Sequence, residues 1–237
     1  VRLTAPQTLK YFDEQGVRIN IISGDAVETV SNIAQSVGVP MADRCVDMST
    51  IKTQEELERV AEECRVFGRV SPEQKKQLVM ALQKKGHTVA MTGDGVNDAP
   101  SIKRADIGVG MGITGTDVTK NVADMVLADD NFATIIGACE EGRRIYDNIR
   151  NVIQFLLSAN LAEVFSVFIA TLVGFTLFQP VQLLWVNLVT DCFPALALGM
   201  ERAEPDVMSR PPRSARESIF AHGVGFDCVY QGVMCAI

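Results

Sequence analysis

Residues Met91 to Pro100 read Met-Thr-Gly-Asp-Gly-Val-Asn-Asp-Ala-Pro and directly follow a short apolar run. This pattern predicts a strand that ends in an acidic loop. Two glycines flank Asp94, so the backbone can turn sharply at the carboxyl end of the strand, where open α/β sheets bind their ligands. Asp94 and Asp98, with the amide of Asn97 between them, suit Mg²⁺ beside a phosphate. The alternative is an ordinary turn, because Gly, Asp and Asn are the usual turn residues.

The composition indicates a globular part and a separate apolar part. Most charged residues lie before Arg150, and almost none lie between Asn151 and Met200. A formal net charge of −7, from 22 Lys and Arg against 29 Asp and Glu, argues against a nucleic-acid partner. The six cysteines show no Cys-x-x-Cys spacing, which predicts reduced, mostly buried thiols. The chain begins at Val1 without a signal peptide and ends in an apolar run, so we expect a fragment of a longer protein.

Apolar runs alternate with amphipathic stretches through residues 1–131. The apolar runs predict strands at residues 17–22, 65–70, 88–91, 107–109 and 125–127. The amphipathic stretches predict helices at residues 25–37, from 54, from 72 to about 86, and from about 116. Ser71 and Pro72 suit the N-cap and the first position of the third helix. This alternation is typical of an α/β fold with a parallel sheet covered on both faces.

Three further positions suit a phosphate site. Ser23-Gly24-Asp25 follows a predicted strand, so the Ser23 hydroxyl and the amides of the next helix can bind a phosphate oxygen. Lys75 lies one turn into a helix and can neutralise phosphoryl charge, and Arg69 precedes that helix. The alternatives are a common strand-to-helix turn for the first stretch and solvated surface cations for Lys75 and Arg69.

These stretches, in this order, resemble the P-type ion-pumping ATPases, whose phosphorylation domain belongs to the haloacid dehalogenase group. Met91 to Pro100 resemble the hinge signature of that family, and Ser23-Gly24-Asp25 resembles its Thr-Gly-Asp. Arg69 to Pro72, followed by Lys75, resemble its Arg-Val-x-Pro and its phosphate-contacting lysine. The resemblance implies a haloacid-dehalogenase-like parallel sheet in a partial phosphorylation domain.

The resemblance also implies a role for each matching residue. Those expected to form the catalytic phosphate site are Ser23, Gly24, Lys75, Asp94, Asn97 and Asp98. Asp94 and Asp98 are the expected Mg²⁺ ligands, and Lys75 is expected to contact the phosphoryl group. Asp25 and Arg69 are expected to face the nucleotide of ATP.

The sequence departs from the family at its start. The phosphorylated aspartate of the family's Asp-Lys-Thr-Gly-Thr is absent, so we expect this chain alone to show no ATPase turnover. Residues Leu3 to Gln7 differ from the Asp-Pro-Pro-Arg often found in relatives, and no nucleotide contact is assigned to them.

A second glycine-rich stretch offers a different hypothesis. Gly110, Gly112 and Gly115 fit Gly-x-Gly-x-x-Gly between a predicted strand and a predicted helix, as in a dinucleotide-binding turn. This turn comes late in the sheet, and the family carries a glycine-rich turn here too, so we favour the pump interpretation.

The second half of the chain predicts membrane helices. No proline occurs from Asn131 to Pro180, and apolar residues recur at helical spacing, which predicts one helix of some forty residues and about 60 Å. Two apolar stretches, separated by a turn at Gln179-Pro180, each reach the ~20 residues that a span needs. We expect the following parts: a domain at 1–131, a stalk at 132–151, spans at 152–178 and 181–200, a loop at 201–221, and the start of another span at 222–237.

The arginines predict the topology of these spans. They lie before the first span and after the second, at Arg143, Arg144, Arg150, Arg202, Arg210, Arg213 and Arg216, and the short connecting turn carries no charge. The positive-inside rule then places both flanks on the cytoplasmic side of a lipid bilayer. The alternative is a buried helical hairpin in a soluble protein.

Polar residues inside the spans predict a cation site. Glu163 and Asp191 are ionisable groups in apolar stretches, where function is the default interpretation. Asn160 shares a helix face with Glu163, and Asn187 and Thr190 share one with Asp191. Pro194 lacks the amide that would bond the carbonyl of Thr190, so we expect that carbonyl to be free. Oxygen ligands alone favour a hard cation.

Both stretches resemble the fifth and sixth membrane helices of sarco/endoplasmic reticulum calcium pumps and their bacterial relatives, except that Cys192 stands where those pumps have glycine. The resemblance implies Ca²⁺ as transported ion, Mg²⁺ and ATP as cofactors, and a multi-pass protein in the cell membrane of a bacterium. The actuator domain, the nucleotide domain and further membrane helices would come from the rest of the same chain. The alternatives are a pump for Mn²⁺, Na⁺, K⁺ or H⁺ and a soluble haloacid-dehalogenase-type phosphatase.

Overall fold

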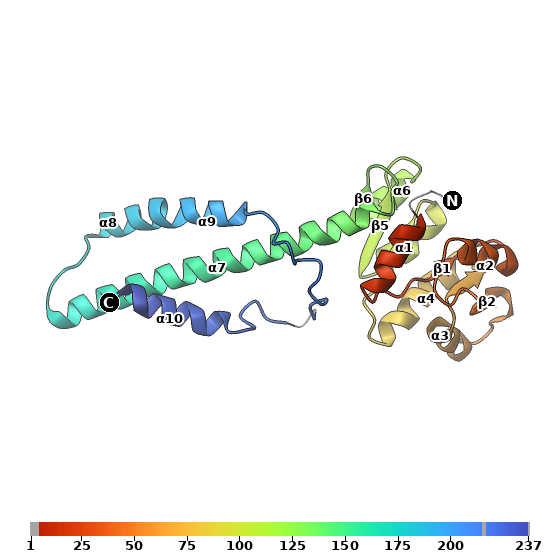
Figure 1. Cartoon of the computed structure of the whole chain (residues 1–237), viewed down its shortest axis with the longest axis horizontal. Helices are drawn as coiled ribbons and strands as arrows, with labels where there is room; N and C mark the ends of the chain where they lie inside the picture. The colour runs from red at the N-terminus through yellow and green to blue at the C-terminus, as the bar shows by residue number, and fades with distance from the viewer. Residues whose placement is uncertain (1–4, 215–216, 237) are drawn as a thin grey trace. The chain divides into compact units, whose positions relative to one another are not determined.

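The computed structural model describes residues 5–214 and 217–236, and the chain divides into two compact units, Val1–Ile136 and Gly137–Ile237 (Figure 1). The first unit contains the α/β part, and the second is helical. The prediction of mostly buried thiols is wrong, because four of the six cysteines are exposed and one, Cys228, is buried. Of the stretch that departs from the family at Leu3 to Gln7, the first two residues lie outside the described residues.

The first unit holds two parallel sheets of three strands each. The first has the order β1-β3-β2, and its strands are β1 (Ile21–Ile22), β2 (Cys45–Asp47) and β3 (Val66–Gly68). The second has the order β4-β5-β6, and its strands are β4 (Ala90–Gly93), β5 (Ile107–Met111) and β6 (Met125–Leu127). The expected single sheet is therefore divided, because the edge strands β1 and β4 share no ladder of backbone hydrogen bonds among the described residues. The parallel direction of the strands is confirmed.

Six α-helices connect and cover these strands. They are α1 (Ala5–Glu14), α2 (Val27–Ser36), α3 (Gln54–Glu63), α4 (Pro72–Lys84), α5 (Ala99–Arg104) and α6 (Asp117–Val122), with short 3₁₀ turns at Met48–Thr50 and Val96–Asp98. The predicted start of α4 is confirmed: Ser71 Oγ accepts from the amide of Gln74, and the Gln74 side chain accepts from the amide of Ser71. The pattern did not predict α1, β2 or α5, and β1 has only two of the six residues expected at 17–22.

The core of this unit connects the two sheets. On β3, Val66 packs into a cluster with Val30 and Ala34 of α2, and Phe67 packs on the opposite face with residues of α3 and α4. Ile22 of β1 contacts the cluster around Phe67 and also the cluster of Met91 at β4. Side-chain packing therefore joins the sheets where backbone hydrogen bonds do not.

The second unit is built on one uninterrupted helix, α7 (Thr134–Val173), of 40 residues (Figure 1). This confirms the predicted long helix, but α7 ends five residues before the expected 178. Gly174, at φ +90°, stops it in a left-handed conformation that favours glycine. The connection to the next helix is therefore longer than the predicted turn at Gln179-Pro180, and it spans residues 174–179.

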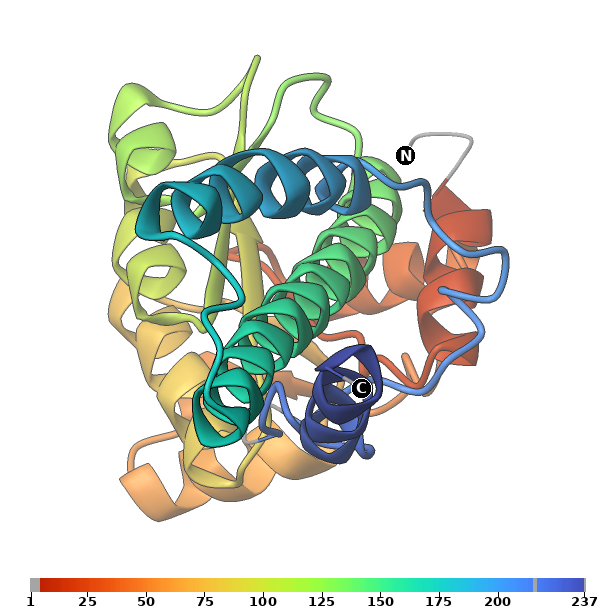
Figure 2. The same cartoon turned by 90° about the vertical axis from the view of Figure 1, so that its left-hand side faces the viewer.

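The remaining helices lie beside α7. They are α8 (Pro180–Trp185), a π-helical turn at Val186–Asp191, α9 (Cys192–Gly199) and α10 (Val224–Ala236). Figures 1 and 2 both show α7 between the α8–α9 pair and α10. At Gly232 an added Cβ would lie 2.8 Å from the Cβ of Leu161, so α10 packs closely on α7 there.

Two helical segments, 134–173 and 180–199, are long and apolar enough to cross a membrane by length and composition. Only 17% and 6% of the residues in their most apolar windows are buried. A core helix of a soluble protein would be mostly buried, so this exposure disfavours the alternative of a packed soluble hairpin. The 13-residue α10 is shorter than a span, and the predicted third span stays a prediction.

Candidate functional sites

The acidic loop after β4 folds back on itself through Asp98. This residue is 8% exposed, and its Oδ2 accepts from the amide of Gly95 at 3.3 Å. Its Oδ1 lies 2.6 Å from Nζ of Lys75 on α4. A Cβ at Gly93 would lie 2.6 Å from the Cβ of Asp98, so only glycine fits the end of this strand. The glycine was predicted to permit a sharp turn, and the structure shows close approach as a second requirement.

Asp94 and Asn97 face solvent on this loop. Neither side chain has a hydrogen bond or ion pair within the described parts of the chain, in contrast to Asp98, both of whose oxygens are engaged. The Asp94 carboxylate and the Asn97 amide are free oxygen donors and fit a Mg²⁺ ion that keeps several waters. No group of three or more His, Cys, Asp or Glu side chains that could hold a metal occurs among the described residues. Asp98 as a Mg²⁺ ligand stays a prediction.

The Ser23 motif and the Arg69 motif meet through their backbones. The amide of Arg69 donates to the carbonyl of Asp25 at 2.8 Å, and the amide of Val70 donates to that of Ser23 at 3.0 Å. Gly68 permits this approach, since a Cβ there would lie 2.5 Å from the Cα of Val27. The Ser23 hydroxyl contacts the carboxylate and the amide of Asp25, both at 3.2 Å.

The structure does not pair all of these residues with one another. The Arg69 guanidinium forms an ion pair of 3.3 Å with Asp47 rather than with Asp25, and its φ of +50° is unusual for a residue with a side chain. No hydrogen bond joins Ser23 or Asp25 to Lys75 or Asp98 within residues 5–214 and 217–236. Lys75 and Asp98 therefore form one contacting pair, and the Ser23 and Arg69 motifs form another.

The glycine-rich turn after β5 already holds a carboxylate. Asp130 is 7% exposed, and it accepts from the amide of Ile113 and from the amide and hydroxyl of Thr114 at 2.7–2.8 Å. These hydrogen bonds lower the pKa of Asp130 to about 2, the Ile113 amide contributing most. The amide of Gly112 donates to Leu127. The amides of Gly112, Ile113 and Thr114 are therefore occupied and not available to a pyrophosphate, which disfavours the dinucleotide hypothesis.

Two threonines, the N-cap residue Thr116 of α6 and Thr119 within α6, contact the acidic loop, and the sequence predicted no role for them. The amide of Thr116 donates to the carbonyl of Asp94 at 3.0 Å. Thr119 is fully buried, and its hydroxyl lies 3.0 Å from the carbonyl oxygen of Gly95 and 3.4 Å from that of Asp94. The N-cap position of Thr116 was the only available signal, since nothing local indicates where the Thr119 side chain points.

Three of the five predicted cation ligands meet between α7 and the α8–α9 segment. The Asn187 amide donates to Oε2 of Glu163 at 2.9 Å. Asp191 lies one turn after Asn187 and is 5% exposed. Oε1 of Glu163 and Oδ2 of Asp191 are buried with no hydrogen-bond partner among the described residues. Unsatisfied buried carboxylate oxygens are costly unless a cation neutralises them, so this arrangement suits a cation ligand.

The other two predicted ligands lie differently. Asn160 and Thr190 are exposed, and the Asn160 amide donates to the carbonyl of Leu156 within its own helix at 2.7 Å. Asn187, Thr190 and Asp191 all belong to the π-helical turn. Pro194 explains that turn, because it cannot donate to the carbonyl of Thr190 and its ring would clash there.

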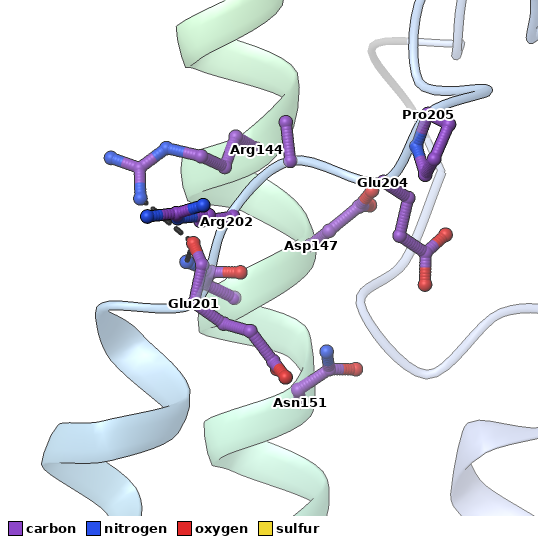
Figure 3. A pocket seen from close by; sticks show the side chains of 9 residues that line it. Arg144, Asp147, Asn151, Glu201, Arg202, Glu204 and Pro205 are labelled. Carbon is purple, nitrogen blue, oxygen red and sulfur yellow. Dashed lines mark hydrogen bonds between the residues drawn. The ribbon is translucent and has the colours of Figure 1, made fainter.

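The loop after α9 is bound to α7 by polar contacts. The Asn148 amide donates to the carbonyls of Gly199 and Glu201, at 3.2 and 2.9 Å. Arg143 donates to the carbonyls of Val207 and Arg210, and Arg210 forms an ion pair with Asp147. A pocket of about 320 Å³ lies between this loop and α7, and Figure 3 shows polar and charged side chains around it. It contains none of the predicted site residues.

Comparisons with known proteins agree with both halves of this description. Residues 1–106 match the family model of the haloacid dehalogenase-like hydrolases, and residues 175–237 match that of the cation transporting ATPase C-terminus. A calcium-transporting ATPase of Bacillus subtilis is 49% identical over 98% of this chain and 26% of its own length. A calcium-transporting ATPase 1 of Yarrowia lipolytica is 41% identical over the whole chain and 26% of its own length.

A third relative comes from a plant. The endoplasmic reticulum-type calcium-transporting ATPase 3 of Arabidopsis thaliana is 43% identical over 92% of this chain and 22% of its own length. The chain thus spans about a quarter of the length of the curated relatives that it matches.

Proposed function

Because this chain belongs to the cation-transporting P-type ATPase family, we propose that it is part of an ATP-driven pump that moves Ca²⁺ across a membrane. The names of the relatives, all calcium-transporting ATPases, support the ion. The phosphorylated aspartate would lie in the part of the pump that residues 1–237 do not include. Residues 1–131 would then form part of the phosphorylation domain, and residues 132–151 the stalk. Residues 152–178 and 181–200 would form two spans of a multi-pass protein in the cell membrane of a bacterium.

In the phosphorylation part, each residue has a distinct proposed task. Lys75 neutralises charge on the phosphoryl group, and its ion pair with Asp98 keeps the ammonium at the end of β4. Asp94 and Asn97, whose side chains are free, hold Mg²⁺, which would neutralise the phosphate oxygens during transfer. The backbone pairing of the Ser23 and Arg69 motifs supports a single nucleotide-facing and phosphate-facing edge, to which Gly24 and Asp25 contribute.

In the membrane part, the observation that carries the proposal is the pair of orphaned oxygens on Glu163 and Asp191. Asn187 orients Glu163 through its amide and leaves its own oxygen available. Ca²⁺ takes about 6 to 8 oxygens, so the proposal requires Asn160, Thr190 and helices from the rest of the pump to complete the shell. The complete pump would also need a lipid bilayer around its spans, and the actuator and nucleotide domains from the rest of the protein.

The decisive experiment scans cations in the full-length protein that contains this chain. Phosphorylation from labelled ATP is measured in purified membranes across Ca²⁺, Mn²⁺, Na⁺, K⁺ and H⁺. We expect Ca²⁺ to be required at the lowest concentration. Glu163→Gln should raise the Ca²⁺ concentration for half-maximal phosphorylation at least about tenfold, because it removes a charged ligand.

A matched control removes an acid outside this site. Asp227→Asn on α10 neutralises a carboxylate that has no partner in the cation cluster, and it should leave the Ca²⁺ dependence unchanged. Phosphorylation that needs a different cation would overturn the calcium assignment. Hydrolysis of soluble phosphate esters by a detergent-free protein would instead support the phosphatase alternative.

A further inference from the structure

The α6 helix approaches the acidic loop at two consecutive peptide groups. Thr116 donates its amide to the carbonyl of Asp94 at 3.0 Å, and the Thr119 hydroxyl lies 3.0 Å from the carbonyl oxygen of Gly95. Both contacts join residues more than twenty positions apart in the sequence. The backbone on the C-terminal side of Asp94 is thus held from outside the loop.

The hydroxyl groups form a short relay with a defined direction. Thr119 has one hydroxyl proton, and it can donate this proton to the carbonyl of Gly95, which can only accept and lies 3.0 Å away. The hydroxyls of Thr116 and Thr119 lie 2.9 Å apart, and when Thr119 donates to Gly95 the Thr116 hydroxyl is the donor between them. The Thr119 side chain has no exposed surface, so its hydroxyl is buried and depends on partners within the protein.

The two carboxylates of the acidic loop, Asp94 and Asp98, are held in different ways. Asp98 is held directly by Lys75 and by the Gly95 amide. The Asp94 carboxylate has no partner of its own among the described residues, so its position depends on the backbone beneath it. A carboxylate that must bind a small, geometrically demanding ion such as Mg²⁺ depends on such support.

We propose that Thr119 is a positioning residue that fixes Asp94 for Mg²⁺ through the carbonyls of Asp94 and Gly95. This inference rests on the proposed function, because Mg²⁺ binding at Asp94 is part of it. Thr119 touches neither phosphate nor metal, and it acts only through the loop. Thr119 contributes through its hydroxyl group. Its methyl group points elsewhere, toward Gly110, where an added Cβ would lie 3.6 Å from it.

The test compares two substitutions in the full-length protein. Thr119→Val keeps the shape and removes the hydroxyl, whereas Thr119→Ser keeps the hydroxyl and removes the methyl. Mg²⁺ binding is measured by titration calorimetry without nucleotide, and the Mg²⁺ dependence of phosphorylation from ATP is measured separately. We expect Thr119→Val to weaken Mg²⁺ binding by about threefold to tenfold, the effect of one lost or distorted hydrogen bond, and Thr119→Ser to bind within about twofold of the wild type.

A matched control separates positioning from general destabilisation. Ser31 is also buried, and its hydroxyl donates to the carbonyl of Ala42 at 2.9 Å, far along the chain from the acidic loop. Ser31→Ala should lower the unfolding temperature but leave Mg²⁺ binding unchanged. Hydrogen exchange of the peptide covering residues 93–98 should accelerate in Thr119→Val and not in Ser31→Ala.

Three outcomes would overturn the proposal: wild-type Mg²⁺ affinity in Thr119→Val, equal loss in Thr119→Ser, or equal loss in Ser31→Ala. Failure of the proposed function is recognised separately. In that case the wild-type protein itself forms no Ca²⁺-dependent phosphoenzyme, while the calorimetric comparison of variants still reports on Thr119.

Discussion

Nζ of Lys75 lies 2.6 Å from Oδ1 of Asp98, and this ion pair joins α4 to the loop after β4. Both side chains are largely removed from solvent, with 15% and 11% of their surface exposed. Removing one partner of an ion pair in such surroundings is destabilising, because the other charge is then left buried without a partner.

Asp98→Asn should therefore destabilise the first unit by about 2 kcal/mol, somewhat less than a fully buried pair would. Chemical unfolding of the chain, followed by a probe in the first unit, measures the loss. Lys75→Met in the same background should add little, because the pair is already broken. Lys76→Met is the control, because Lys76 lies on the same helix and forms no ion pair among the described residues. Additive effects of Lys75 and Asp98 would contradict the prediction.

The low pKa of Asp130, about 2, predicts a pH dependence of the glycine-rich turn. The folded-state pKa lies below the ordinary value of about 4, so the stabilisation is fully present above pH ~4 and is lost as the pH falls toward 2. Hydrogen exchange of the Ile113 and Thr114 amides, corrected for intrinsic rates, should accelerate through that window. In Asp130→Asn these amides should exchange rapidly at all pH values, whereas Asp117→Asn should leave them protected.

The π-helical turn at Val186–Asp191 predicts a role for Pro194, which has no backbone amide to donate. Pro194→Ala restores an amide that can bond the carbonyl of Thr190, which should convert the turn to α-helix and rotate Asn187 away from Glu163. We expect the Ca²⁺ concentration for half-maximal phosphorylation to rise about tenfold, the equivalent of ~1.4 kcal/mol. Pro180→Ala is the control, because Pro180 lies at the first position of α8, where an amide has no helical partner. Equal effects of both substitutions would count against this account.

The contact at Gly232 predicts a steric effect on helix packing. Gly232→Ala places a methyl group 2.8 Å from the Cβ of Leu161, so α10 must move away from α7, at a cost of about 1–3 kcal/mol. The thermal half-life of the detergent-solubilised protein should fall. At Gly225 an added Cβ would meet its nearest neighbour at 3.8 Å, so Gly225→Ala should be tolerated. A half-life as long in Gly232→Ala as in Gly225→Ala would show that the helices are not in contact there.

Local signals allowed much of this description to be predicted. The Ser71 cap, the two glycines around Asp94 and the proline-free stretch before Pro180 act on neighbouring residues, and α4, the acidic loop and α7 form as expected. Short strands were harder to predict. β1 and β2 have two and three residues, which is too few for a period-two pattern to stand out. These residues form strands because they pair with β3.

By itself, the amino-acid sequence determined which stretches are apolar enough to span a membrane and which motifs resemble those of the P-type ATPases, and it predicted the residues of the phosphate and cation sites. Only the tertiary structure decided that Lys75 contacts Asp98, that Asp130 fills the glycine-rich turn, that Thr119 supports the acidic loop, and that Glu163 meets Asn187. The physical reason is distance along the chain. Caps, turns and helical periodicity depend on residues within about four positions, whereas these contacts join residues 16 to 25 positions apart, which no local pattern encodes.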